Sequence, residues 1–271
     1  MKVLLVTLVL VSATAVFAQP TVSNGGVLNA ASFDTSMPVA PGSLISIFGT
    51  NLASGTSIAD SIPLSASLGN VSATVNGIAV PLYFVTHTSS FDQINAQLPW
   101  NVPAGSVQLV VTAGGVASAP QAIQVGQFSP GIFSANGSGT GQAIAVNFPD
   151  YSYAAAAGAL PGLTSRPAVA GDPNGIIIYA TGLGAVSPAI ANGASPSSTQ
   201  VSTTTTNPTV LIGGVPAQQV LFSGLAPGDV GVYQLNVVLA PNTPTGNAVS
   251  LQIQMGGVTS TDKLTMAVAS K

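Results

Sequence analysis

Short runs in which apolar and polar residues alternate recur along most of the chain. In residues 106–111 the side chains of Val107, Leu109 and Val111 share one face, because successive residues of an extended strand point to opposite sides. Glycine, proline, asparagine and serine, which favour turns, separate these runs. The pattern predicts an all-β protein made of antiparallel β-sandwiches.

The strands expected from this pattern fall into two groups. In the first half they cover residues 44–49, 71–75, 78–85, 92–98, 106–112 and 116–125. In the second half they cover residues 175–180, 209–212, 215–222, 232–239, 248–254 and 258–268. Asn76-Gly77 tolerates the positive φ angles of a type I′ turn and predicts a hairpin between strands 71–75 and 78–85.

The second half repeats the first. Five segments recur in the same order: 47–52 with 178–183, 75–79 with 212–216, 93–95 with 234–236, 103–105 with 244–246, and 113–118 with 255–260. The repeat predicts one sandwich at residues 19–125 and another at 172–271. Residues 126–171 are expected to connect them, with a β-hairpin between 141–147 and 151–155. The serine- and threonine-rich residues 187–208 are expected to form a mobile loop.

Residues 1–18 have the pattern of a secretory signal peptide. Lys2 supplies a positive charge, an apolar run follows, and small residues end at Ala18. A membrane anchor is the alternative, but the apolar run is short for a bilayer span. We expect cleavage after Ala18 or Ala15 and a product that is secreted, extracellular or at the cell surface, with no membrane contact after cleavage.

The composition argues against several classes of partner and cofactor. Charged residues are only 4% of the chain, and its four Lys and Arg are scattered, so nucleic-acid binding is not expected. The chain has no cysteine and a single histidine, which argues against a zinc site. Calcium stays open, because aspartate and asparagine oxygens would suffice. We expect no cofactor and no metal.

Catalytic chemistry has little support in the sequence. The seven aspartates are isolated along the chain, so no carboxylate pair is evident. A Ser-His-Asp triad would have to use His87, the only histidine, with Ser89, Ser90 or Asp92 close by in sequence. We therefore do not expect an enzyme, and a hydrolase that uses His87 is a remote alternative.

Several phrases carry a resemblance to known families. Residues 41–52 (PGSLISIFGTNL) and 174–183 (NGIIIYATGL) resemble the first strand of the immunoglobulin-like IPT/TIG domain. The chain from Gly26 onwards is similar to the uncharacterised Solibacter-type C-terminal domain family of secreted bacterial proteins, through GVLNAASF (26–33), QINAQLPW (93–100), YATGLG (179–184) and GVYQLNV (231–237). The resemblance implies tandem immunoglobulin-like sandwiches, no assigned activity, and a place in longer exported proteins.

Three aromatic residues are candidates for ligand binding. Trp100 lies between two prolines in Leu98–Pro103, and a rigid exposed indole there would stack on a sugar ring. Tyr151 and Tyr153 in the middle segment are candidates for the same role. The alternative for Trp100 is packing at the end of the first sandwich or against the second.

These observations predict a secreted, non-enzymatic binding or adhesion module for an extracellular polysaccharide or protein. A self-assembling structural protein of a surface layer or fibre is the alternative, with a second copy of the chain as partner. Low charge and uncovered sheet edges favour such assembly, and residues 19–31 would then be a donated strand.

Overall fold

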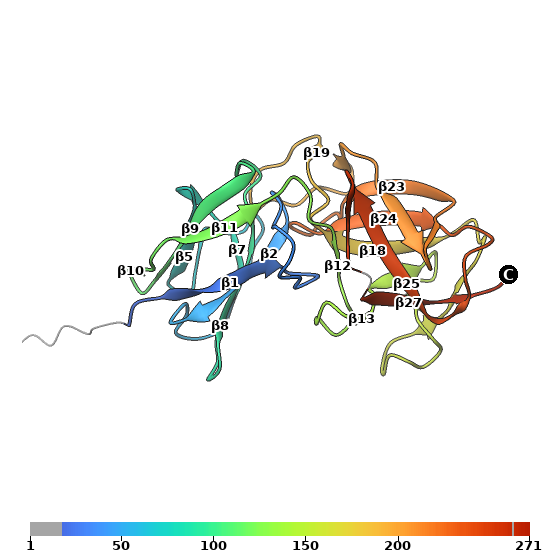
Figure 1. Cartoon of the computed structure of the whole chain (residues 1–271), viewed down its shortest axis with the longest axis horizontal. Helices are drawn as coiled ribbons and strands as arrows, with labels where there is room; N and C mark the ends of the chain where they lie inside the picture. The colour runs from blue at the N-terminus through green and yellow to red at the C-terminus, as the bar shows by residue number, and fades with distance from the viewer. Residues whose placement is uncertain (1–17, 262) are drawn as a thin grey trace, which may run out of the picture.

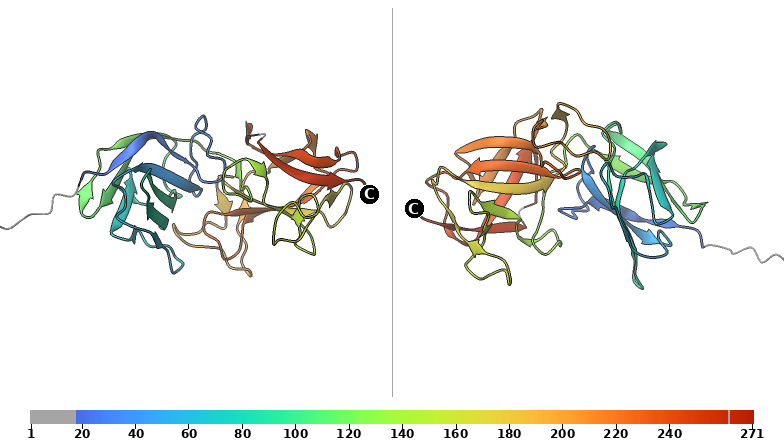
Figure 2. Two further views of the ribbon diagram at one scale, coloured as in Figure 1. Left: turned by 90° about the horizontal axis from the view of Figure 1, so that it is seen from below. Right: turned by 180° about the vertical axis from the view of Figure 1, so that it is seen from behind.

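The computed structural model describes residues 18–261 and 263–271. It contains two β-sandwiches that lie side by side along the long axis of the molecule (Figures 1 and 2). The signal peptide expected at residues 1–18 falls almost wholly outside the described residues.

The first sandwich contains two antiparallel sheets. One has the order β1-β2-β8-β7-β3, with β1 (Thr21–Asn29), β2 (Leu44–Thr50), β8 (Asp92–Gln97), β7 (Leu82–His87) and β3 (Ser57–Ile58). The other is built on β11 (Gln121–Val125), β9 (Gly105–Ala113) and β5 (Val71–Val75), with the short strands β4 (Ser67–Leu68), β6 (Ile78–Ala79) and β10 (Val116–Ala117) at its margins.

The second sandwich repeats this arrangement and adds strands. Its first sheet has β16 (Ser165–Arg166), β15 (Tyr153–Ala154), β14 (Ala145–Asn147), β18 (Ile176–Thr181), β24 (Tyr233–Val238), β23 (Gln219–Leu225), β20 (Thr203–Thr204) and β19 (Val186–Ser187), in that order, and β12 (Gly131–Ile132) pairs with β18. Its second sheet has β13 (Gly141–Gln142), β27 (Leu264–Ala269), β25 (Gly246–Met255), β21 (Thr209–Ile212) and β22 (Val215–Pro216), joined by β17 (Ala168–Val169) and β26 (Val258–Thr259).

The strand order is that of an immunoglobulin domain in both sandwiches. With the main strands lettered A to G along the chain, β1-β2-β8-β7 is the sheet A-B-E-D and β11-β9-β5 is the sheet G-F-C. In the second sandwich β14-β18-β24-β23 and β27-β25-β21 take the same places. The predicted fold, all-β with two tandem immunoglobulin-like sandwiches, is confirmed.

The duplication extends to individual hydrogen bonds. The N–H of Val111 donates to Ser118 Oγ (3.1 Å), and the N–H of Ile253 donates to Ser260 Oγ (2.9 Å). In each pair the serine N–H returns a bond to the carbonyl of the same strand residue (2.8 Å in both). Equivalent serines thus close the same turn in both copies.

The hairpin at Asn76-Gly77 is confirmed, but the strand predicted after it is wrong in extent. Both turn residues have positive φ (48° and 77°), as a type I′ turn requires. The predicted strand 78–85 divides into β6, which pairs with β5, and β7, which belongs to the opposite sheet. The predicted strand 215–222 divides in the same way into β22 and β23. In neither segment does the sequence pattern indicate where the chain changes sheets.

Residues 126–171 are part of the second sandwich rather than a connection between sandwiches. The expected hairpin is present, with Val146 of β14 opposite Tyr153 of β15. However, β14 also pairs with β18 as the A strand of the second sandwich, and β13 and β17 pair with β27. Separate cores fill the sandwiches, one around Ile47, Ile94 and Leu109 and the other around Ile178, Leu235 and Leu251.

Part of the serine- and threonine-rich segment that was predicted to be a mobile loop is hydrogen-bonded to the first sandwich. Gly193 donates its N–H to Gln97 Oε1 (2.6 Å) and accepts the N–H of Leu64 (2.8 Å). Asn192 Oδ1 accepts the N–H of Trp100 (2.8 Å). These contacts hold residues 192–193 of the second sandwich against the end of the first.

A buried threonine hydroxyl joins the two sandwiches at their interface. Thr181 Oγ1 accepts the N–H of Leu44 from the first sandwich (2.9 Å) and donates to the carbonyl of Gly231 in the second (2.7 Å). Thr181 is fully buried, so water cannot replace either bond.

We predict that Thr181→Val lowers the stability of the docked pair by about 1–3 kcal/mol, because valine has the shape of threonine but leaves the N–H of Leu44 and the buried carbonyl of Gly231 without this partner. Denaturant unfolding would measure the loss, and small-angle X-ray scattering would report looser docking. Thr50→Val is the matched control, because Thr50 is the exposed equivalent of Thr181 in the first sandwich. Equal unfolding midpoints for the two variants would contradict this role of Thr181.

Candidate functional site

The outward face of the first A-B-E-D sheet has a pair of amide side chains at its centre. In β8, Ile94 and Ala96 point into the core, and Gln93 and Asn95 therefore point outward. Gln93 Nε2 donates to Asn95 Oδ1 (2.7 Å), and Ser46 Oγ donates to the same oxygen (2.9 Å). These two hydrogen bonds hold the amide groups in one orientation, and both side chains keep further hydrogen-bond donors and acceptors.

The second sandwich has the same amide pair in the equivalent strand. In β24 the side chains of Leu235 and Val237 are buried in the core. Gln234 and Asn236 face outward, and Gln234 Nε2 donates to Asn236 Oδ1 (2.8 Å). The core does not require either polar residue, and yet both copies have the pair.

Half-buried aromatic residues flank each amide pair on the same face. Cross-strand partners lie side by side in a sheet, and they place aromatic rings next to the amides. We call these two sets the amide–aromatic platforms. The first consists of Gln93 with Phe48 and Asn95 with Phe84, and the second of Gln234 with Tyr179 and Asn236 with Phe222.

Each platform is bordered by a β-bulge that exposes one large apolar side chain. The register of β7 on β8 shifts at Tyr83, which is 43% exposed. The register of β23 on β24 shifts at the equivalent Leu221, which is 53% exposed. A bulge re-aims the side chain of its extra residue, and here it places an apolar group at the same edge of both platforms.

The first platform continues into a row of phenylalanines. The ring of Phe48 lies 5.8 Å from that of Phe91 in an edge-on arrangement and 6.4 Å from that of Phe33. Phe91 is 44% exposed, so the row reaches the solvent.

The outward faces that carry the two platforms meet at a pocket of about 280 Å³ between the sandwiches. Leu44 and Tyr83 line it from the first sandwich, and Phe133, Tyr179 and Asp229 line it from the second. Partial loss of water at the rim raises the pKa of the Asp229 carboxyl. Loss of water also raises the pKa of Tyr179, and the charge of Asp229 raises it further. The two outward faces are thus continuous across the domain boundary.

Trp100 lies in a different pocket. Its half-buried ring packs against the core of the second sandwich, and it lines a pocket of about 300 Å³ with Pro41, Gln127 and Ala185. Its buried Nε1 has no hydrogen-bond partner among the residues that the structure describes. The position matches the packing alternative considered for this residue, and its ligand-binding role stays a prediction.

Tyr151 and Tyr153 lie near the second platform. Tyr151 is 60% exposed and contacts Phe148 edge-on, with ring centroids 5.9 Å apart. Tyr153 is half-buried in β15, and both tyrosines contribute to the raised pKa of Tyr179. The structure thus brings these two candidates together but places Trp100 elsewhere.

His87 is bound to an aspartate whose other oxygen has a structural role. His87 Nδ1 lies 2.6 Å from Asp92 Oδ1, and Asp92 Oδ2 accepts the N–H of Leu52 (2.7 Å). No hydrogen bond within the described part of the chain joins His87 to a serine or threonine hydroxyl. His87 is thus engaged with Asp92, and the hydrolase alternative stays a prediction.

Residues 18–261 and 263–271 contain no group of three or more histidine, aspartate or glutamate side chains placed to hold a metal ion. Over the same residues, no helix has the length and apolar character needed to cross a membrane.

No family model and no curated protein match the chain, so the family resemblance stays a prediction. Similar solved structures include the Bacteroides ovatus mixed-linkage glucan utilization locus protein SGBP-B in complex with a mixed-linkage heptasaccharide, at 12% identity and a TM-score of 0.34, covering 86% of this chain and 45% of that one. The chain thus spans less than half of that protein's length.

Two other similar structures cover nearly the whole chain. Domains 5-6 of the S-layer protein SbsC match at 11% identity and a TM-score of 0.27, covering 93% of this chain and 100% of that one. The tandem Ig repeats of Dlar match at 11% identity and a TM-score of 0.21, covering 94% of this chain and 100% of that one. Likenesses this distant carry no argument about function, and the fold assignment rests on the strand order.

The platforms were missed by reasoning from the sequence, although a signal was present. Residues 93–95 and 234–236 were recognised as repeats, and the outward direction of their glutamine and asparagine follows from the alternation of a strand. The flanking aromatics come from other strands, so only the pairing register brings them together.

An ion pair beside the tyrosines gives a testable pH dependence. Arg166 Nε donates to Asp150 Oδ2 (2.8 Å), and this bond lowers the pKa of the Asp150 carboxyl to about 2. The pair therefore contributes its full stabilisation only above the ordinary aspartate pKa, and the contribution is lost as the pH falls towards 2.

We predict that the Asp150 carboxyl titrates near pH 2 in carbon-detected NMR and that Arg166→Ala moves this titration up towards 3.8. Asp34 is the internal control, because its pKa is lowered mainly by hydrogen bonds from Ser36 and should not change in the variant. An Asp150 titration that is unaffected by loss of Arg166 would show that the ion pair does not form in solution.

Proposed function

We propose that this protein is an exported, non-enzymatic binding module that recognises an extracellular polysaccharide through its two amide–aromatic platforms. The observation that carries the proposal is the repetition of the same surface in both copies. Each copy has a hydrogen-bonded glutamine–asparagine pair with an aromatic ring beside each amide. The export is supported by the composition and pattern of residues 1–18.

The chemistry of the platforms suits a neutral sugar polymer. Amide side chains both donate and accept hydrogen bonds, as hydroxyl-rich ligands require, and aromatic faces pack against the apolar faces of sugar rings. None of the platform residues is charged, and only 4% of the chain is, so ionic ligands have little to bind. Two platforms in series would engage neighbouring segments of one chain and gain affinity through the second contact.

A self-assembling structural protein is the second candidate. It is favoured by the uncharged edge strand β1, whose residues 21–29 contain neither lysine nor another charged gatekeeper. However, β1 pairs with β2 of its own sandwich, so the expectation that residues 19–31 are donated to another copy would require this pairing to open.

The test is binding of neutral polysaccharides, by affinity electrophoresis and titration calorimetry, to the protein and to two platform variants. Phe48→Ala and Tyr179→Ala each remove one flanking ring from a different platform. We expect each to weaken binding about ten-fold, the usual scale for loss of a central aromatic contact. The double variant should lose more binding affinity than either single variant, because an aromatic contact is then missing from both platforms.

Leu163→Ala is the control, because Leu163 is 49% exposed and lies outside both platforms. Equal affinity of the two single platform variants, the double variant and the Leu163→Ala control for a bound polysaccharide would refute the platform assignment. Binding of a protein and of no polysaccharide would assign the surface to a protein ligand instead. Light scattering over a concentration series would identify large assemblies, which would favour the structural alternative.

A further inference from the structure

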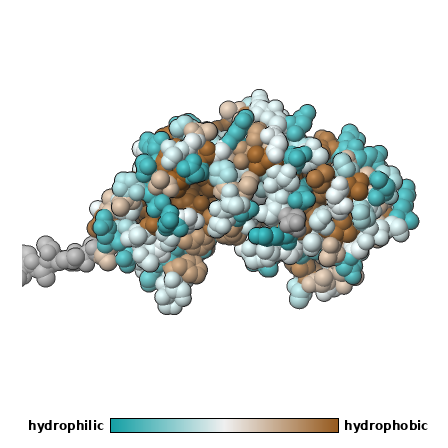
Figure 3. All heavy atoms as spheres, in the orientation of Figure 1, coloured by the Kyte–Doolittle hydropathy of each residue, from teal (hydrophilic) through white to brown (hydrophobic). Residues whose placement is uncertain are grey.

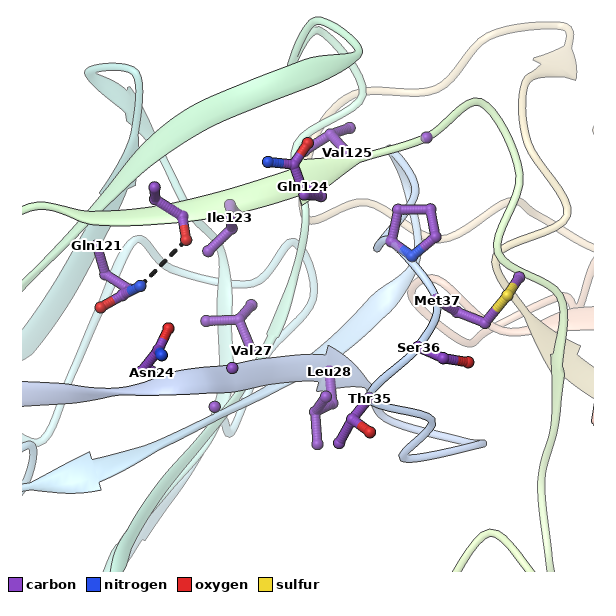
Figure 4. A pocket seen from close by; sticks show the side chains of 15 residues that line it. Asn24, Val27, Leu28, Thr35, Ser36, Met37, Gln121, Ile123, Gln124 and Val125 are labelled. Atoms are coloured by element: carbon purple, nitrogen blue, oxygen red, sulfur yellow. Dashed lines mark hydrogen bonds between the residues drawn. The ribbon is translucent and has the colours of Figure 1, made fainter.

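The first sandwich is open along one side, between the edge strands of its two sheets. A groove of about 520 Å³ separates β1 from β11, and residues 24–28, 35–38 and 121–126 line it. Figure 3 shows apolar side chains at the bottom of this hollow, and Figure 4 shows Val27 and Ile123 pointing toward one another across it. None of the described residues that line the groove is charged.

The second sandwich has the same two strands, but a longer segment lies between the two halves of its strand A. Strand β1 corresponds to β12 and β14 taken together, as the pairing register shows. In the first sandwich Val22 faces Gly49 and Val27 faces Ile47. At the equivalent positions of the second sandwich, Ile132 faces Ala180 and Ala145 faces Ile178. Only residues 23–26, a bulge, separate the two halves of β1. Residues 133–144 separate β12 from β14, and this longer segment crosses to the opposite sheet.

In crossing, the longer segment adds a strand to the edge of the second sandwich. Strand β13 runs parallel to β27, with Gly141 opposite Leu264 and Gln142 opposite Thr265. Gly141 donates its N–H to the carbonyl of Lys263, and Ala143 donates to the carbonyl of Thr265 (2.9 Å each). The edge that is open in the first sandwich is therefore paired in the second.

At the corresponding edge of β11, no strand among the described residues other than β9 pairs with Ala122, the equivalent of Thr265. Ala122 lies opposite Gln108 of β9, but both backbone groups of Gln108 are hydrogen-bonded to Asn76 instead. The backbone N–H and carbonyl of Ala122 therefore point away from β9 and into the groove. Gln121 Nε2 folds back onto the Ala122 carbonyl (3.1 Å), the bond drawn in Figure 4. Farther along, Val39 pairs in parallel with Val125 and closes only the end of the groove.

We propose that this groove binds an extended, uncharged segment of a partner protein as an added strand, parallel to β11 and paired with Ala122. Addition of a strand to a free sheet edge is a common mode of peptide recognition. The occupant in the second sandwich defines the chemistry, because Gly141-Gln142-Ala143 is small and uncharged. A second copy of the chain is a poorer donor, because its own β13 is already paired with β27. This proposal does not depend on the proposed polysaccharide binding.

The experiment titrates the protein with a synthetic peptide of residues 138–144 (SGTGQAI), the chain's own model of such a segment. We expect saturable binding, with NMR shift changes centred on Ala122 and slower hydrogen exchange of its amide. Ala122→Pro removes the free N–H without removing a bond to β9, and it should weaken binding at least ten-fold. Ala122→Ser retains the N–H and is the matched control.

Two further variants test the same groove without touching Ala122. Gln121→Ala frees the Ala122 carbonyl and should tighten peptide binding, by about two- to ten-fold if one competing hydrogen bond is removed. Replacement of residues 23–26 by residues 133–144 should fill the groove with the protein's own strand and abolish binding.

Absence of peptide binding at millimolar concentration would overturn the proposal. So would unchanged affinity in a folded Ala122→Pro variant, or shift changes that lie away from the groove. Concentration-dependent dimers in which the Ala122 amide is protected would assign the groove to a second copy and overturn the proposed partner. Polysaccharide binding should be the same in all these variants, so failure here and failure of the platform assignment can be told apart.

Discussion

The arrangement of the whole molecule depends on the docking of its two sandwiches, and a buried hydroxyl bridges their interface. The N–H of Leu44 and the carbonyl of Gly231 both need a partner at the interface, and a hydroxyl can accept from one and donate to the other at once. Thr181 occupies that position. With the orientation fixed there, and with residues 192–193 held against Gln97 and Trp100, the outward faces of the two A-B-E-D sheets become continuous at Tyr83 and Tyr179.

The parts of the fold that depend on local pattern were predictable from the sequence. Alternation located most of the main strands, the Asn76-Gly77 dipeptide fixed a hairpin, and the internal repeat revealed two copies of one fold. The errors concern long-range pairing. The division of residues 78–85 between two sheets, the incorporation of residues 126–171 into the second sandwich and the docking of the loop at residues 192–193 depend on contacts between distant segments.

The candidate site shows the same division between local and distant information. Trp100 was a predicted ligand-binding residue because it is the only tryptophan of the sequence, but its ring is partly buried against the core of the second sandwich. The amide pairs were visible as a repeat, whereas their pairing with Phe48, Phe84, Tyr179 and Phe222 followed only from the register of the strands. The bulges at Tyr83 and Leu221 have no evident sequence signal, because neither glycine nor proline marks them.

The difference between the two copies is as informative as their similarity. Both keep the same core strands and the same outward amide pairs, so the loss or gain of a segment between the halves of strand A did not alter the rest of the sandwich. It altered one edge. In the second sandwich that edge is closed by β13, whereas in the first the carbonyl of Ala122 accepts a hydrogen bond from the neighbouring Gln121 side chain. An incoming strand would displace a single exposed hydrogen bond and gain backbone pairing along an uncharged, apolar floor, so exchange of partners at this edge costs little.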